Sequence, residues 1–254
     1  LCGHSHVVLA GIFLVVATAI VFATLTAPSG TPVWADPPVP NAPIGVAKGV
    51  KPGRVVWVHD PAATDWEGPG DGHWWESTHT DQAVVDQMMS GSLRGLTDQV
   101  SDAGAWDHLF RYFNLSRGAG DVGYSPGERI VIKVNFVGCH YLWGGTDENS
   151  YDMIHDPDYM NTSPQMILAL LRQLVYVVNV SPADISVGDP LCLFPNEYYS
   201  SLHAEFPDVR YLDYYGGNAE HPRTGVPLSD VPVHWSTRPA GVIPDYVPAC
   251  YVEA

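Results

Sequence analysis

The stretch PGERIVIKVNFVGCH, residues 126–140, decides the expected fold. A Pro-Gly turn opens it, and the β-branched run Ile130–Ile132 that follows is typical of a strand buried on both faces. A strand of this kind is expected at the centre of a sheet, in parallel pairing. Lys133 and Asn135 interrupt the apolar run at its carboxyl end. Because ligands of open α/β sheets bind outside the carboxyl ends of the strands, polar side chains here are candidates for a site.

Strand and helix patterns alternate on both sides of this stretch. Further strand patterns cover Arg54–Val58, Ile185–Gly188 and Val209–Leu212, and helical patterns cover 81–96, 102–113, 162–178 and 196–205. Such alternation predicts an α/β domain over residues 53–213, layered, with a mostly parallel sheet flanked by helices. An apolar N-terminal helix is expected to precede it.

Residues Val7–Leu25 form an apolar run without a charge. The run is long enough to span a bilayer, and it also fits the core of a secretory signal, with a plausible small-residue cleavage site before Asp36. A buried helix of the globular domain is the remaining alternative. We therefore expect 1–35 to be a signal peptide or membrane anchor, and the protein to be exported: periplasmic, membrane-anchored or extracellular.

Two segments flanking the α/β domain lack regular patterns. Residues 36–52 are rich in proline and predict a stiff linker. Residues 214–254 have Pro or Gly every few positions, and we expect this irregular segment to lead into a C-terminal part beyond Ala254.

The charge balance excludes some classes of partner. The chain of 254 residues carries a formal net charge of -16, from 28 acidic and 12 basic residues. Nucleic-acid binding needs Lys and Arg to neutralise phosphates, so no nucleic acid is expected. The only expected membrane contact is through the apolar N-terminal segment. The sequence identifies no redox partner or protein partner.

The loop from Ala62 to Thr80 is long and rich in aromatic residues. It contains the tryptophans Trp66, Trp74 and Trp75 and the histidines His73 and His79. Long loops are usually functional or disordered. So many tryptophans indicate that this one packs on the body of the domain.

The cysteines do not have the spacing of a metal cluster. The chain has Cys2, Cys139, Cys192 and Cys250, whereas iron–sulfur and structural zinc sites commonly use closely spaced pairs. In an exported chain, two of Cys139, Cys192 and Cys250 could form a disulfide. Unpaired buried thiols are the alternative.

Several histidines stand beside aspartates in loops, and this pairing suits zinc or another divalent metal. The candidate metal ligands are His79, Asp81, His155 and Asp156. No His-Glu-x-x-His motif occurs, and ordinary surface histidines are the alternative.

Lys133 and Asn135 are separated by one residue in a strand, so both point to the same sheet face. A cation and an amide there can hold a carboxylate or phosphate; alternatively, Lys133 pairs with Asp189. Loop residues from neighbouring strand ends are expected to line the rim. The candidate ligand-binding set is Lys133, Asn135, Asp189, His59, Asp60 and His140.

Three pieces in this order, 126–136, 161–175 and 183–190, resemble the N-terminal half of domain-of-unknown-function family 362. The similar features are the Lys-x-Asn strand end, the Thr-x-Pro helix start and the Asp-Ile-x-Val-Gly-Asp strand, and the resemblance covers roughly residues 53–213. Members are often associated with iron–sulfur ferredoxin modules. The resemblance implies redox or metal-assisted chemistry, with a cofactor supplied by another segment or a partner, because this chain has no iron–sulfur motif.

Two functional hypotheses follow. The first is an exported, enzyme-like domain of the family-362 type with its site at the strand ends. The second is a non-catalytic envelope or extracellular binding module that uses the loop containing Trp66, Trp74 and Trp75 as its contact surface. A pocket that holds Lys133 favours the first, and a flat exposed aromatic patch favours the second.

Overall fold

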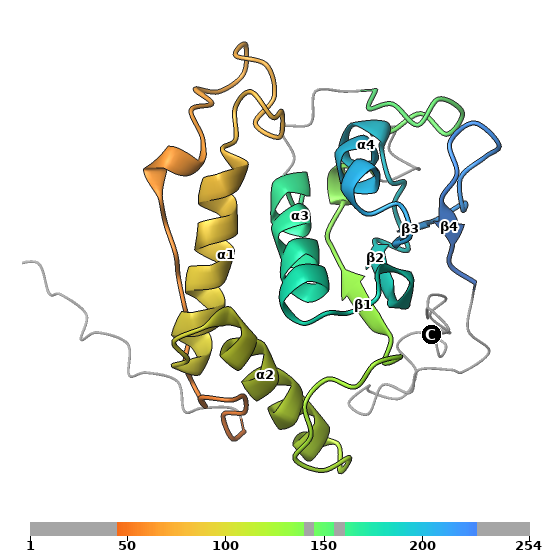
Figure 1. Cartoon of the computed structure of the whole chain (residues 1–254). Helices are drawn as coiled ribbons and strands as arrows, with labels where there is room; N and C mark the ends of the chain where they lie inside the picture. Colours follow the sequence, from red (N-terminus) through yellow and green to blue (C-terminus); the bar gives the residue numbers. More distant parts are fainter. Residues whose placement is uncertain (1–44, 140–144, 155–160, 228–254) are drawn as a thin grey trace, which may run out of the picture. The chain divides into compact units, whose positions relative to one another are not determined.

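The computed structural model describes residues 45–139, 145–154 and 161–227 (Figure 1). The chain divides into the units 1–46 and 47–254, and the fold described here belongs to the second. The predicted apolar helix Val7–Leu25 and the candidates His140, His155, Asp156 and Cys250 lie outside the described residues. Within those ranges, no helix combines the length and apolarity needed to cross a membrane.

Four parallel strands form one sheet in the order β1-β2-β3-β4. They are β1 (Ile130–Lys133), β2 (Ile185–Gly188), β3 (Arg210–Asp213) and β4 (Thr224–Gly225). In the register of the sheet, Ile132 stands beside Val187 and Val187 beside Tyr211. Helices flank the sheet, so the predicted α/β class with parallel pairing is confirmed (Figure 1).

The predicted central position of β1 is wrong, because β1 is an edge strand of the described sheet. Exposure alternates along it, and Val131 is 44% exposed, whereas β2 is buried at every position. A run of β-branched residues suits an edge strand with one covered face as well as a central strand. Composition alone therefore did not distinguish the two positions.

The predicted strand Arg54–Val58 is also wrong. This segment is extended, but it pairs with none of the described strands and runs alongside α1 (Gln82–Thr97) (Figure 1). Val56 packs close to Gly95 of α1, while Val55 and Trp57 are 89% and 81% exposed. The alternating apolar pattern is therefore that of an extended segment with one side on a helix, and a sheet is not needed to explain it.

Polar side chains at the helix N-termini explain where the helices begin. Asp81 Oδ1 accepts hydrogen bonds from the backbone N–H groups of Ala83 and Val84 at the start of α1. Ser101 caps α2 (Asp102–Ser116) in the same way. Such a cap stabilises a helix by about 1 kcal/mol.

The helices nearest the sheet are α3 (Pro164–Arg172) and α4 (Asn196–Glu205). Ser163 Oγ accepts from the N–H of Met166, and Pro164 occupies the first turn of α3. A π-helical turn, η4 (Gln173–Val177), continues α3. Short 3-10 turns complete the elements: η1 (Pro61–Ala63), η2 (Val137–Cys139) and η5 (Pro182–Asp184).

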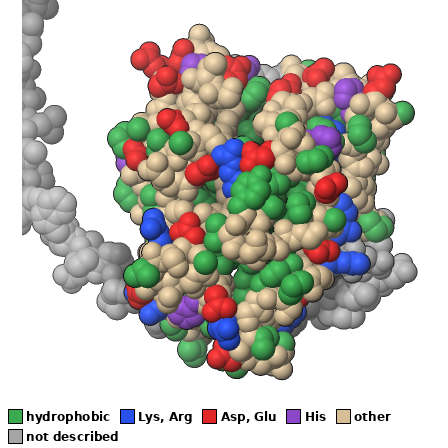
Figure 2. Space-filling view, viewed as in Figure 1, with side chains coloured by type: hydrophobic (Ala, Val, Ile, Leu, Met, Phe, Trp, Pro, Cys, Tyr) green, Lys and Arg blue, Asp and Glu red, His purple; other side chains and the backbone are tan. Residues whose placement is uncertain are grey.

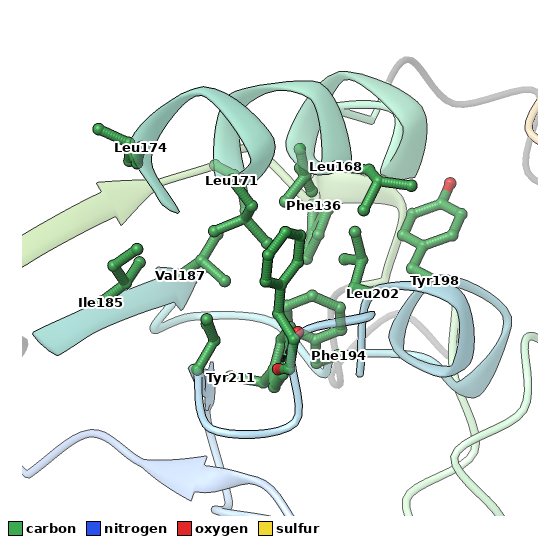
Figure 3. Close-up of a cluster of buried hydrophobic side chains, with 14 of the residues drawn as sticks. Phe136, Leu168, Leu171, Leu174, Ile185, Val187, Phe194, Tyr198, Leu202 and Tyr211 are labelled. Atoms are coloured by element: carbon green, nitrogen blue, oxygen red, sulfur yellow. Dashed lines mark hydrogen bonds between the residues drawn. The ribbon is translucent and has the colours of Figure 1, made fainter. Parts of the chain in front are cut away.

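The hydrophobic core lies between the sheet and the helices α3 and α4 (Figure 3). Phe136 and Phe194 meet edge to face, with ring centroids 5.0 Å apart. These two rings follow the carboxyl ends of β1 and β2, so core packing fixes both strand ends. The labelled core residues are Phe136, Leu168, Leu171, Leu174, Ile185, Val187, Phe194, Tyr198, Leu202 and Tyr211.

Candidate functional site

An ion pair joins the carboxyl ends of β1 and β2. Lys133 Nζ lies 2.9 Å from Asp189 Oδ2, with the lysine side chain 60% exposed and the aspartate side chain 4% exposed. Asp189 also accepts from the backbone N–H groups of Phe136 (3.0 Å) and Leu191 (3.2 Å). The structure therefore brings these two predicted residues together, and the carboxylate ties the loop after β1 to the loop after β2.

Asn135 lies next to this pair in the chain and is held through its backbone. Its N–H donates to Thr162 Oγ1 (3.0 Å), and its carbonyl accepts from the Thr162 N–H (2.8 Å). Its exposed side chain lies on the same face as that of Lys133. Asn135, Lys133 and Asp189 line none of five cavities found among the described residues.

Asp213 plays the same part at the end of β3. It is fully buried, and its Oδ2 accepts from the N–H of Phe194 (2.7 Å). Its Oδ1 accepts from the Tyr151 hydroxyl (3.1 Å) and from the N–H groups of Tyr215 and Gly216. Burial first and Asp213 second raise the pKa of the Tyr151 hydroxyl. The sequence prediction missed this carboxylate, although its place directly after an apolar strand was a signal.

The predicted rim residues His59 and Asp60 lie in the extended segment beside α1 (Figure 1). The His59 ring stacks on Trp57 at 5.4 Å with an interplanar angle of 3°. Asp60 Oδ1 accepts from the Ala62 N–H (3.0 Å) and caps η1. No contact in the described ranges joins His59 or Asp60 to the ion pair at the strand ends.

The predicted metal ligand His79 is surrounded by carboxylates. Its Nδ1 lies 3.1 Å from Asp65 Oδ1 and 3.9 Å from Asp71 Oδ2, and its Nε2 lies 4.0 Å from Glu76 Oε2. The other described candidate, Asp81, is occupied as the cap of α1. Nowhere in the part of the chain that the structure describes do three or more His, Cys, Asp or Glu side chains form a group that could hold a metal ion.

Cys139 and Cys192 are both buried and both free, so the structure shows the unpaired-thiol alternative for these two residues. Burial raises the pKa of the Cys139 thiol to about 12 and also raises that of Cys192. Asn161 Nδ2 contacts the Cys139 sulfur at 3.4 Å. Thiols of this kind are packed and protonated, which makes them poor nucleophiles.

The tryptophan-rich loop packs on the body of the domain, as predicted. Trp75 stacks on His73 with ring centroids 4.9 Å apart, and its edge meets Tyr198 of α4 at 5.7 Å. Its carbonyl accepts from Gln165 Nε2 of α3 at 2.6 Å. The loop is therefore fixed to both helices, and Figure 2 shows acidic and histidine side chains gathered over it at the upper left.

Two adjoining cavities lie between this loop and the helices α3 and α4. The larger, of about 790 Å³, extends to η1 and the start of α1, and the smaller is about 340 Å³. We call them together the tryptophan-loop cleft. The residues that line both are Ser77, Thr78, Pro164, Gln165 and Ser201; the smaller cavity is also lined by Trp75, Glu76 and Glu197.

Three residues that line the smaller cavity each have a buried polar atom without a hydrogen-bond partner: Trp75 Nε1, Gln165 Oε1 and Glu197 Oε2. Gln165 is only 8% exposed. A buried unpaired group costs about 1–3 kcal/mol, but each of these atoms has less than 1 Å² of accessible area, so a ligand in the cavity does not reach them without a side-chain movement. The sequence prediction missed Gln165 and Glu197; a polar Gln on the apolar face of the helix after Pro164 was the available signal.

Comparison with protein-family models, with curated proteins and with solved structures finds no match. The functional argument therefore rests on the geometry. Among the described residues, the strand ends and the tryptophan-loop cleft both gather polar side chains, and at the strand ends Lys133 and Asp189 neutralise each other. Of these two, the cleft combines a cavity with unpaired polar atoms and an aromatic ring.

Proposed function

We propose that this chain is an exported, non-catalytic binding domain whose site is the tryptophan-loop cleft. The observation that carries the proposal is the cleft itself, a cavity lined by Trp75 beside the polar residues Gln165 and Ser77. A ligand in the cleft would contact both an aromatic residue and polar residues, the usual composition of a small-molecule site. The export part of the proposal rests on the apolar run of residues 7–25.

The size and composition of the cleft support binding of a small molecule. Volumes of about 340 and 790 Å³ fall in the range of roughly 300–1,000 Å³ that small-molecule sites occupy. Trp75, Pro164 and Leu168 supply apolar surface. The hydroxyls of Ser77 and Thr78 add polar groups that can orient a ligand.

The test is to follow the indole N–H resonance of Trp75 in the ¹⁵N-labelled whole chain while probes of different charge are added. Ethanolamine, glycerol and acetate represent a cation, a neutral polyol and an anion. At least one is expected to shift the Trp75 resonance and to raise the melting temperature, because binding to the folded state stabilises it. If none of the three does so, the cleft is not a binding site and the proposal fails.

A matched pair of variants tests whether the shift of the Trp75 resonance arises from binding in the cleft. Gln165→Leu removes a polar side chain that lines the cleft, together with its hydrogen bond to the Trp75 carbonyl, and is expected to abolish the ligand-induced shift of the Trp75 resonance. Ser200→Ala, on the exposed side of α4, is expected to leave that shift unchanged. A shift that both variants retain would place the ligand elsewhere.

One observation favours the strand ends as a second candidate. Lys133 remains 60% exposed although it pairs with Asp189, and the exposed Asn135 side chain lies on the same face. We propose that these two side chains bind a carboxylate or phosphate, as the resemblance to family 362 also suggests. Lys133→Ala is then expected to weaken binding of inorganic phosphate, and an unchanged affinity would refute this candidate.

A further inference from the structure

A third cavity, of about 220 Å³, is formed by residues of α4, β3, β4 and the segment before β4. Its lining includes Tyr199, His203, Tyr211, Arg223 and Thr224, and we call it the Arg223 cavity. Its lining contains no aspartate or glutamate, whereas each of the four other cavities found among the described residues has at least one. In a chain with a formal net charge of -16, this is therefore a cavity in which an anion meets a guanidinium and no carboxylate from the lining.

The guanidinium of Arg223 is held in place by neutral groups. Its Nε donates to the Phe194 carbonyl (3.0 Å), its Nη1 to the Pro222 carbonyl (2.9 Å) and its Nη2 to Asn196 Oδ1 (3.0 Å). Its Cζ lies 3.5 Å from the centroid of the Tyr199 ring, which is a cation–π contact. Within the described ranges, no carboxylate forms an ion pair with Arg223.

The terminal nitrogens of Arg223 retain donors beyond these bonds. Each terminal nitrogen of a guanidinium carries two N–H groups, and Nη1 and Nη2 each use one of them in the hydrogen bonds named above. Both nitrogens are bonded to the same carbon, so their N–H groups are held a short, fixed distance apart and can contact two oxygens of one carboxylate or phosphate. The acceptor of Nη1, Pro222, is an exposed residue, so this end of the guanidinium lies near solvent.

The charge of Arg223 is only partly compensated by its surroundings. Burial has the largest effect on the Arg223 pKa and lowers it, while Tyr199 and Asp213 raise it by less. Arg172 shows the opposite case, because its hydrogen bonds to Glu205 raise its pKa. The Asp213 carboxylate accepts instead from the groups described above at the end of β3. An anion in the cavity would supply the close negative charge that Arg223 lacks.

We propose that the Arg223 cavity binds a small oxyanion, a carboxylate or a phosphate, whose oxygens accept hydrogen bonds from Nη1 and Nη2 of Arg223. The volume of about 220 Å³ lies below the range of roughly 300–1,000 Å³ that small-molecule sites occupy, which limits the ligand to a few non-hydrogen atoms. Tyr199, His203 and Thr224 add side chains that can hydrogen-bond to it. The cavity shares no lining residue with the tryptophan-loop cleft, so this proposal does not depend on the binding function proposed above.

The experiment titrates inorganic phosphate and acetate separately into the ¹⁵N-labelled whole chain at constant pH, with sodium chloride at matched ionic strength as the reference. The backbone N–H resonances of His203 and Thr224 are expected to shift to saturation with at least one oxyanion and not with chloride, which has no pair of oxygens for the two nitrogens. The responding probe identifies the oxyanion as a phosphate or a carboxylate. The N–H of Asn135 reports on the strand ends in the same spectra. Saturation at Asn135 alone, an equal response to chloride, or no saturation at all would overturn the proposal.

Arg223→Lys tests the paired nitrogens, because it keeps the positive charge and removes the guanidinium. The affinity for the responding oxyanion is expected to fall by about tenfold or more. Arg129→Lys makes the same change at an exposed position outside the cavity and is expected to leave that affinity unchanged. An affinity that Arg223→Lys retains would overturn the proposal. Should this variant fail to fold, because Arg223 also donates to Phe194 and Asn196, the comparison of oxyanion with chloride in the native chain decides by itself.

Discussion

Lys133 and Asp189 form an asymmetric ion pair, in which an exposed ammonium group meets a buried carboxylate 2.9 Å away. The burial of Asp189 is made possible by two further donors, the N–H groups of Phe136 and Leu191. The carboxylate therefore links two loops through their backbones, and the lysine adds charge from the solvent side. Substitution of Asp189 is therefore expected to lower the free energy of unfolding more than substitution of Lys133.

Asp189→Asn is expected to lower the free energy of unfolding by about 2–3 kcal/mol, as for loss of buried hydrogen bonds to a charged group. In the variant, the amide NH₂ faces at least one of the groups that donate to the Asp189 carboxylate in the native chain, so two donors then face each other. Urea denaturation monitored by circular dichroism measures the change. Asp208→Asn, at an exposed position of the loop before β3, is the control and should cost little. Equal losses in both variants would contradict the structural role of Asp189.

Lys133→Ala is expected to cost less, about 1 kcal/mol or below, because ion pairs with an exposed partner contribute little. Asp189 retains its two backbone donors in this variant. The same urea titration gives the comparison. A loss as large as that of Asp189→Asn would mean that the buried carboxylate depends on the lysine charge.

The parts of the fold that the sequence predicted are those in which local pattern and tertiary position agree. The predicted strands Ile185–Gly188 and Val209–Leu212 contain buried apolar residues, and an aspartate directly follows each of them. The helix starts at Asp81 and Ser163 follow from capping chemistry, which is local. The pairing of Lys133 with Asp189 could be anticipated because neighbouring parallel strands bring their carboxyl ends together.

The errors arise where tertiary packing decides. Val55 and Val56 suit a strand, but whether this segment pairs in a sheet or places one side, with Val56, on α1 depends on the whole fold. The sequence analysis did not predict the tryptophan-loop cleft, for a related reason. Gln165 and Glu197 are 32 positions apart in the numbering and meet Trp75 only through folding, so neither stands in a recognisable motif.

The position of the extended segment 54–60 can be tested with Trp57. Because this side chain is 81% exposed, Trp57→Ser is expected to change the free energy of unfolding by less than about 0.5 kcal/mol. Trp106→Ser is the comparison, since that tryptophan packs against the core and donates to Gln173 Oε1 at 3.1 Å. Trp106→Ser should lower the free energy of unfolding several times more than Trp57→Ser does. A large loss in Trp57→Ser would instead support burial of this segment, as in a sheet.

The buried thiols predict how stability depends on pH in the alkaline range. Burial raises the pKa of Cys139 from 9.0 to about 12, so above about pH 9 the folded chain holds a proton that the unfolded chain releases. Stability is therefore full below about pH 9 and falls as the pH rises toward 12. Raised tyrosine pKa values act in the same direction, and their effect begins between pH 9 and pH 10, because unfolded tyrosine is half ionised at about pH 10.

The difference between the native chain and its cysteine variants from pH 9 to pH 10 therefore isolates the thiols, because the tyrosine contribution is common to all of them. Urea unfolding across this pH interval is expected to show a falling free energy of unfolding in the native chain and a shallower fall in Cys139→Ala, where one of the two raised thiols is gone. Cys192→Ala should reduce the slope as well, because burial raises that pKa too. Each variant is compared with its own value at pH 8, which removes the cost of the cavity that the substitution leaves. A slope that both variants share with the native chain would show that these thiols are not held protonated by the fold.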